Sequence, residues 1–205
     1  RQVFYANDMS LGKNQVKLER QSDDPDTAAA FRAYRENVRW VVGGVLFIGL
    51  NIPGSNDNFG RTPQMDAEHA QRGRANAVWL AQGFDMAKKN DYAAVFIFIQ
   101  ANPDFDLSYL RRTNRADGYA AFKQDLLAHT LSFGKPVVLV HGDTHRYRVD
   151  QPLYDPATLK RVEQFTRIES FGSPFVDWIS VSLDPDKPRL ISVRTGKPLN
   201  PGPQY

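Results

Sequence analysis

The sequence contains no cysteine, which excludes disulfide bonds and thiol chemistry. This absence leaves the compartment open, because a chain without cysteine is compatible with both the cytoplasm and the periplasm. No hydrophobic run approaches the length of a membrane span, and the chain does not open with the charged and then apolar segments of a signal peptide. We therefore expect a cytoplasmic or periplasmic protein without a membrane span.

A strong excess of one charge is also missing. The 26 lysine and arginine residues against 23 aspartate and glutamate residues leave a formal net charge of +3, and the charges are interspersed. Because a nucleic-acid groove needs clustered positive charge, the composition does not indicate a nucleic-acid partner. The sequence specifies no oligomeric state either.

The chain does have enough apolar residues for one core. Hydrophobic residues make up 41% of its 205 residues, which predicts a single domain over 1–205. Residues 1–37 are polar and irregular and show no core, although Thr27 is placed to cap a short helix over 28–36. The chain begins at Arg1 instead of methionine, as a fragment or a processed chain would.

Apolar runs and turn residues divide the middle of the chain into strands and helices. Gly43-Gly44 between two apolar runs is the signal of a tight β-hairpin, and Thr62-Pro63 is typical of a helix start. The pattern predicts, in chain order, hairpin strands over 38–42 and 45–50, a helix over 62–89, a strand over 93–99, a helix over about 115–132 and a strand over 137–140.

The strand over 137–140 is the element around which the chain is organised. Its four aliphatic residues predict a strand buried on both faces, as in a parallel α/β sheet, and such sheets bind ligands at the carboxyl ends of their strands. If the backbone stays extended afterwards, the side chains of His141, Asp143 and His145 project to one side. Imidazole and carboxylate ligands suit zinc, manganese or iron. The alternative is that His141 caps a carbonyl group and His145 lies on a surface loop.

Polar side chains follow the other apolar strands as well. Asn51 ends the second hairpin strand, and Gln100 ends the strand over 93–99. We expect Asn51, Gln100 and residues 141–145 to meet at one edge of a sheet. Beyond His145 come short alternating segments over 160–168, 176–183 and 189–193. A turn over 184–187 joins the last two of them, which predicts an antiparallel end of the chain. The fold class is therefore a layered α/β domain with β-rich flanks.

The order of these motifs resembles the C-terminal part of the catalytic domain of calcineurin-like metallophosphoesterases, in particular those similar to purple acid phosphatases. In that family a strand, a helix, a strand ending in His-x-Pro, a further helix and a strand ending in Gly-His-x-His follow one another. Here Gly142-Asp143-Thr144-His145 stands in the place of the last motif, and residues 45–51, 79–80 and 97–103 keep the order. The resemblance implies a layered α/β sandwich of mixed sheets flanked by helices, incomplete at its N-terminus.

The resemblance also implies an activity and a site. The activity is hydrolysis of phosphate monoesters or diesters by a water activated on divalent manganese, zinc or iron, dinuclear in the full-length protein. The implied site has His145, Asp143 and Gln100 as metal ligands, and His141 beside them as a catalytic acid or as a group that supports the ligands. Its contacts of the phosphate oxygens are Asn51, Asn56, Asn58 and Arg146. For these four residues, which would contact the substrate, the alternative is an ordinary structural role in a loop.

Two departures from the family pattern define the competing hypothesis. Ala101 occupies the place of the His-x-Pro histidine and cannot bind metal, and the Asp-x-His, Gly-Asp and Gly-Asn-His motifs have no match before Val38. The sequence therefore predicts the back half of a phosphoesterase, which by itself binds metal weakly and has little activity. The alternative is a domain of the same ancestry that no longer catalyses and instead binds a ligand or a partner.

Overall fold

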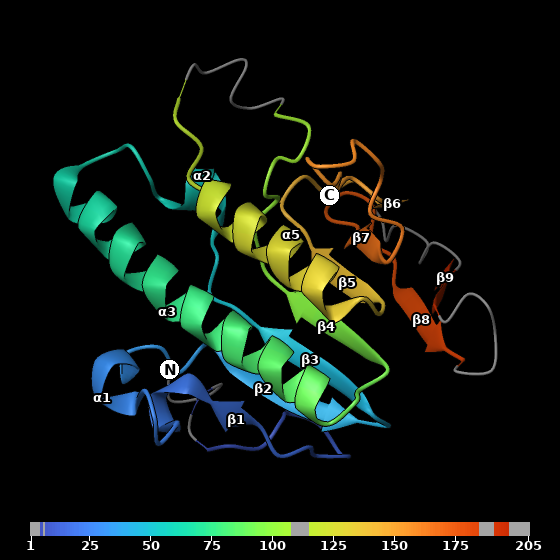
Figure 1. The fold of residues 1–205 in the computed structure, drawn as a ribbon, viewed down its shortest axis with the longest axis horizontal. Coiled ribbons are helices and arrows are strands. Elements are labelled where there is room, and N and C mark those ends of the chain that lie inside the picture. Colours follow the sequence, from blue (N-terminus) through green and yellow to red (C-terminus); the bar gives the residue numbers. More distant parts are fainter. Residues whose placement is uncertain (1–4, 6, 108–114, 185–190, 197–205) are drawn as a thin grey trace, which may run out of the picture.

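A seven-stranded mixed sheet forms the centre of the protein, seen here in a computed structural model that describes residues 5, 7–107, 115–184 and 191–196. The strand order is β1-β2-β3-β4-β5-β7-β6, and β8 and β9 form a second, two-stranded sheet (Figure 1). The strands are β1 (Glu19–Arg20), β2 (Val38–Val42), β3 (Val45–Gly49), β4 (Ala94–Phe98), β5 (Val137–His141), β6 (Arg148–Asp150), β7 (Phe165–Glu169), β8 (Ile179–Leu183) and β9 (Ile191–Thr195).

Strands β3, β4, β5 and β7 are parallel neighbours, and antiparallel strands close the sheet on both sides. This arrangement confirms the general α/β class predicted from the apolar runs. It also explains why β4 and β5 carry almost no polar residues, since a parallel strand in the middle of such a sheet is buried on both faces.

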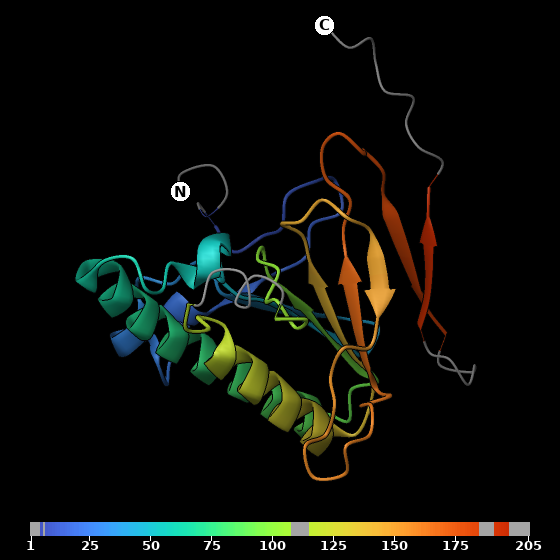
Figure 2. The same cartoon turned by 90° about the horizontal axis from the view of Figure 1, so that it is seen from above.

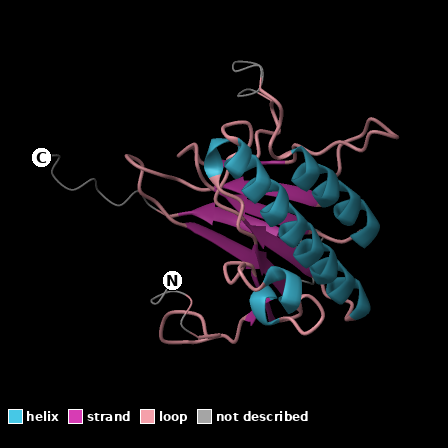
Figure 3. Cartoon of the chain, turned by 90° about the vertical axis from the view of Figure 1, so that its left-hand side faces the viewer, coloured by secondary structure: helices cyan, strands magenta, loops and turns pink. Residues whose placement is uncertain are grey.

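Helices cover one face of the sheet, and the β8–β9 hairpin packs on the other (Figure 2). Figure 3 shows the two long helices side by side across the strands. The helices are η1 (Gln21–Asp23, a 3-10 helix), α1 (Ala28–Phe31), α2 (Gly54–Asp57), α3 (Pro63–Lys89) and α5 (Ala120–Phe133). None of the helices in the described residues is long and apolar enough to cross a membrane.

The long helices largely follow their sequence signals. The Thr62 hydroxyl accepts a hydrogen bond from the Met65 amide at 3.2 Å, so α3 begins where the Thr-Pro pair predicts. Helix α5 ends as predicted at Gly134, whose φ of 68° is the left-handed conformation that glycine adopts readily. It begins at Ala120, several residues later than predicted. The reason is a turn just before it, in which the Asp117 carboxylate accepts a hydrogen bond from the Tyr119 amide at 2.9 Å.

The β-hairpin of β2 and β3 is confirmed, with Val42 paired to Val45 across Gly43-Gly44. The segment before it differs from the expectation of a region without a core. Gln21 and Asn37 are fully buried and hydrogen-bonded to each other at 2.8 Å, and Asn37 also donates to Asn76 of α3 at 2.8 Å. This part of the core is polar, so hydrophobic periodicity could not reveal it.

One expectation about a short element is wrong. Helix α1 is only four residues long, and its N-cap Thr27 makes no capping hydrogen bond with its side chain. Strand β7, within the segment predicted over 160–168, runs parallel to β5 and belongs to the main sheet. The antiparallel pairing of β8 and β9 is confirmed, while residues 185–187 of the predicted connecting turn lie outside the described residues.

Candidate functional site

The carboxyl ends of β3, β4 and β5 lie at one edge of the sheet. The Leu50 amide donates to the Phe98 carbonyl at 3.0 Å, and the Gly142 amide donates to the Gln100 carbonyl at 3.3 Å. These bonds extend the parallel pairing just beyond the strand ends. The structure therefore places Asn51, Gln100 and residues 141–145 at the same edge, as predicted.

Asp143 is an exposed carboxylate held by neutral donors. Its Oδ1 faces the Gln100 amide nitrogen at 3.3 Å, and its Oδ2 accepts the Asn102 backbone amide at 3.4 Å. A Cβ atom added to Gly54 would lie 2.9 Å from Asp143 Oδ2, so the absence of a side chain at Gly54 allows this close approach. The carboxylate is thus oriented without a cationic partner among these contacts.

One ring nitrogen of His145 bonds to the protein, and the other has no hydrogen-bond partner among the described residues. Its Nδ1 lies 2.7 Å from the Ser173 carbonyl oxygen, which can only accept, so in the neutral ring Nδ1 carries the proton and Nε2 has the lone pair. The ring packs over Gly172, where an added Cβ would come within 2.5 Å of it. Metal-binding histidines in proteins commonly donate their second nitrogen to a carbonyl in this way.

His141 differs from the prediction that it lies beside Asp143 and His145. It is 2% exposed and shares the helix-covered face of β5 with Val137 and Leu139. The chain does not stay extended beyond the strand, because φ is 86° at Asp143 and 63° at His145. In this conformation His141 cannot act as a catalytic acid at the exposed edge. Instead, its Nδ1 bonds to the Gly142 carbonyl at 3.0 Å, as the capping alternative foresaw.

Burial of His141 predicts a pH effect on stability. Desolvation lowers the pKa of His141 below its usual 6.5. The charges of Arg167 and Arg148 lower this pKa as well, whereas the Glu169 carboxylate raises it. Between the lowered folded-state pKa and the unfolded value of 6.5, the unfolded chain binds a proton that the folded chain does not. Stability therefore falls as pH falls below about 6.5, by at most ~1.4 kcal/mol per pH unit from this group.

Urea denaturation of the wild type and of His141→Gln at pH 7.5 and 5.5 measures this contribution. The wild type is expected to lose more stability than the variant over that interval. Other titrating groups are common to both proteins and cancel in the difference. Equal losses would show that His141 does not titrate differently in the two states.

Gln100 and Asn56 have contacts that differ from their predicted roles. The Gln100 side-chain oxygen, the atom that would bind a metal, accepts the Gly54 amide at 2.6 Å, while its nitrogen faces Asp143. Gln100 therefore orients Asp143. Asn56 is 3% exposed, and its amide accepts from the Gly118 backbone at 2.9 Å and donates to Ala116 at 3.0 Å. Asn56 thus fastens the start of α5 to α2 and is not available to a substrate.

The three remaining predicted contacts lie on the surface or are half-buried. Asn51 is half-buried, and its carbonyl accepts the Asn76 side chain at 2.9 Å, which fixes its backbone. Asn58 is half-buried in a left-handed conformation with φ of 62°. Arg146 is exposed next to His145. Of these, Asn51 lies two residues beyond the end of β3 and Arg146 follows His145, so both remain candidates for phosphate contact.

The buried ion pair between Arg72 and Asp57 was not predicted from the sequence. Arg72 of α3 is 2% exposed and pairs with the Asp57 carboxylate, with the Asp57 carbonyl at 3.1 Å and with Glu68 at 2.7 Å. The second oxygen of Asp57 lies 3.2 Å from Nε2 of His69, whose side chain is 20% exposed. Burial raises the pKa of Asp57 to about 6, although Arg72 opposes the shift.

This ion pair supports an unusual turn of the backbone. Ser55, Asn56, Asp57 and Asn58 all have φ between 55° and 62°, a left-handed conformation that L-residues adopt only at a cost. Asn and Asp tolerate it best, and the run of turn-forming residues was the signal in the sequence. Tyr119 closes the turn by donating to the Pro53 carbonyl at 3.1 Å, and burial raises the pKa of Tyr119 to about 12.

Comparisons with protein-family models, with curated proteins and with solved structures found no match. Within the described ranges, no three or more histidine, cysteine, aspartate or glutamate side chains form a group that could hold a metal ion. The site is therefore defined by its own geometry. It consists of Asp143 and His145 at the carboxyl edge of parallel strands, with Gln100 and the Ser173 carbonyl holding them.

Proposed function

We propose that this chain contributes Asp143 and His145 to the metal centre of a phosphoesterase that hydrolyses phosphate monoesters or diesters. The observation that carries the proposal is the His145 ring, which donates Nδ1–H to the Ser173 carbonyl and leaves Nε2 uncommitted beside the strand edge. Carboxylate and imidazole are ligands of manganese, zinc and iron. The fold we propose with it is the layered sandwich of the metallophosphoesterases.

Asp143 and His145 bring a carboxylate and an imidazole to this edge, Asp143 against the residues after β4 and His145 against the residues after β7. Asp143 and His145 are both exposed, and each is oriented by a neutral contact, from Gln100 and from Ser173. Two ligands do not complete two coordination spheres, so a dinuclear centre requires further ligands from outside the described residues. By itself the chain is therefore expected to bind a divalent metal weakly and to hydrolyse phosphate esters slowly.

A bound divalent metal would supply a water of lowered pKa and neutralise charge on the phosphate. The chain's own residues provide the setting for that chemistry. Gln100 and the Asn102 amide keep the Asp143 carboxylate pointing along the edge. Arg146 adds a positive charge beside His145, and Asn51 adds an amide at the end of β3, so that both can contact phosphate oxygens.

Binding of Mn²⁺ tests the proposal directly. Wild type, His145→Ala and Asp143→Asn are titrated with Mn²⁺ by electron paramagnetic resonance, and hydrolysis of a chromogenic phosphodiester is followed in the same samples. We expect both variants to bind Mn²⁺ at least about tenfold more weakly, a loss of ~1.4 kcal/mol or more. Weak hydrolysis by the wild type should require the metal and disappear in His145→Ala.

A matched control separates the site from a general loss of imidazole. His129 of α5 stacks on Phe84 at 5.1 Å between ring centroids, on the helix layer. His129→Gln should bind Mn²⁺ within a factor of two of the wild type. A wild type that binds no Mn²⁺ would contradict the proposal and favour the non-catalytic binding domain. Activity that survives in His145→Ala would place the chemistry elsewhere.

A further inference from the structure

The segment from Gly142 to His145 is bonded to the end of β7 by a buried carboxylate. Glu169, the last residue of β7, is fully buried. Its Oε1 accepts a hydrogen bond from the Thr144 hydroxyl. Its Oε2 accepts hydrogen bonds from Arg148 Nη2 at 2.7 Å and from Arg148 Nε at 3.1 Å. Thr144 is the residue between the two proposed metal ligands. Glu169 therefore bonds to the residue that joins the two proposed ligands.

The backbone on both sides of Thr144 needs such support. Asp143 and His145 have φ of 86° and 63°, in the left-handed region that non-glycine residues rarely adopt. Such conformations persist only where the surroundings fix them. Here the surroundings are the Thr144 bond in the middle and a contact to each ligand side chain, from Gln100 at 3.3 Å and Ser173 at 2.7 Å.

Arg148 pairs with the Glu169 carboxylate and holds it in place. Its guanidinium binds Glu169 through two nitrogens and reaches Asp106 Oδ2 at 2.8 Å. A buried carboxylate without a cation would be strongly penalised, so this pair allows a charge at a fully buried position. A charged acceptor also forms a stronger hydrogen bond with the Thr144 hydroxyl than a neutral one would.

We propose that Glu169 is a positioning residue, which acts through Thr144 to hold Asp143 and His145 in the left-handed conformations that direct their side chains. As a statement about metal ligands this inference rests on the proposed function. Its structural content, that Glu169 and Thr144 set the conformation of His145, can be tested without metal.

Three variants of the 205-residue chain test the proposal. Thr144→Val removes the hydroxyl and keeps the shape, Thr144→Ser keeps the hydroxyl, and Glu169→Gln removes the charge. The metal-free readout is the ¹⁵N NMR spectrum of the His145 imidazole, which reports the tautomer. We expect the Nδ1-protonated form in the wild type and in Thr144→Ser. We expect a mixture of tautomers in Thr144→Val and Glu169→Gln, because the ring no longer stays on the Ser173 carbonyl.

Mn²⁺ affinity is the second readout. It should fall about 10- to 100-fold in Thr144→Val and Glu169→Gln and recover in Thr144→Ser. The His129 resonances serve as the internal control for folding, and Thr144→Val keeps the buried Glu169–Arg148 pair if Glu169→Gln fails to fold. An unchanged His145 tautomer in Thr144→Val would overturn the inference. Absence of Mn²⁺ binding in the wild type would overturn the proposed function, while the tautomer comparison would still decide the role of Glu169.

Discussion

Replacing Arg72 by methionine is expected to lower the free energy of unfolding by about 3–5 kcal/mol, the usual cost of removing one partner from a buried ion pair. Arg72 is 2% exposed and bonds to the Asp57 carboxylate and carbonyl and to Glu68. Methionine fills part of the space but leaves the buried Asp57 carboxylate without its cation. The left-handed turn of α2 then keeps the contact between Asp57 and His69 of α3 at 3.2 Å but loses the stronger one to Arg72.

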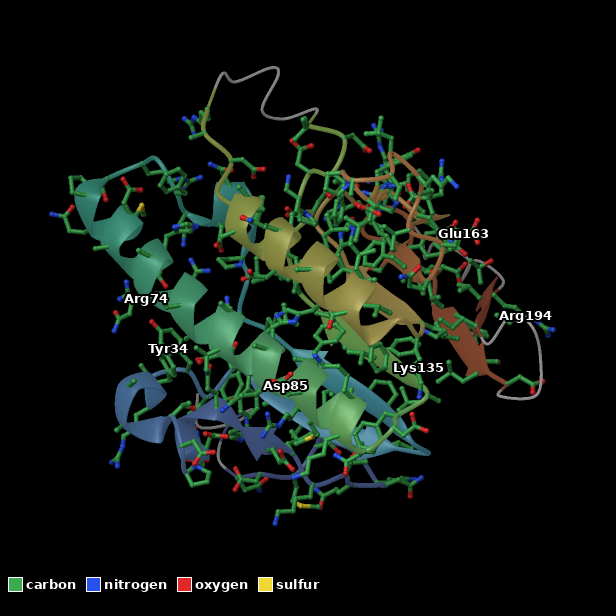
Figure 4. The ribbon with its side chains drawn as sticks, in the orientation of Figure 1. Tyr34, Arg74, Asp85, Lys135, Glu163 and Arg194 are labelled. Carbon is green, nitrogen blue, oxygen red and sulfur yellow. The ribbon has the colours of Figure 1, made fainter. Side chains whose placement is uncertain are left out.

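Two further proteins make this measurement specific. Arg74→Met changes an exposed arginine on the same helix, which points outward in Figure 4, and should shift stability by no more than about 0.5 kcal/mol. Arg72→Met combined with Asp57→Asn removes both charges and should recover part of the loss, since the buried charge is then gone. Chemical denaturation of these four proteins and of the single variant Asp57→Asn completes the double-mutant cycle, which gives the coupling energy between Arg72 and Asp57. A single-variant loss below about 1 kcal/mol would show that the pair contributes little.

The loss in Arg72→Met should also depend on pH. Burial raises the folded-state pKa of Asp57 to about 6, above its usual 3.8, and removal of the opposing Arg72 raises it further. A carboxyl whose pKa is raised by folding is stabilised in its protonated form. The destabilisation should therefore be largest above pH 7 and shrink as the pH falls toward 5. A penalty that grows on acidification would contradict this assignment of the proton.

The parts of the fold that sequence reasoning predicted are those with a strong local signal. The Gly43-Gly44 hairpin, the Thr62-Pro63 helix start and the apolar strands of the sheet appear where expected. Each depends on turn geometry, capping or periodicity within a few residues. The position of Gln100 and Asp143 at one edge of the sheet was also predicted, because parallel strands present their carboxyl ends together.

The parts that were not predicted depend on contacts between distant residues. Gln21, Asn37 and Asn76 form a buried amide network that no apolar pattern reveals. Arg72 looks like a surface residue in the sequence and is buried only because α2 places Asp57 against it. His141 appeared to share a side with His145, but the left-handed turn after β5 separates them. These features come from side-chain pairing and backbone turns that local propensity does not specify.

The orientation of residues at the end of β4 bears on the resemblance to the metallophosphoesterases. The motif comparison places the metal-binding histidine of His-x-Pro at Ala101. In the structure Ala101 is fully buried in the main core, and its amide donates to the Ile52 carbonyl at 3.1 Å. The preceding residue, Gln100, is exposed and points at Asp143. The position that faces the site is therefore 100, one residue earlier than the motif alone indicates.

Histidine introduced at these two positions should therefore have opposite effects. Gln100→His places an imidazole beside Asp143 on the exposed edge, and we expect Mn²⁺ affinity to rise about tenfold, or ~1.4 kcal/mol, with little change in stability. Ala101→His forces a larger, polar ring into a packed core, and we expect a loss of about 1–3 kcal/mol in the free energy of unfolding with no gain in metal affinity. Gln71→His, on the exposed side of α3, controls for an added surface imidazole. Metal titration and chemical denaturation of the three variants decide between the positions: tighter Mn²⁺ binding by Ala101→His alone would restore the motif correspondence and contradict the buried orientation of residue 101.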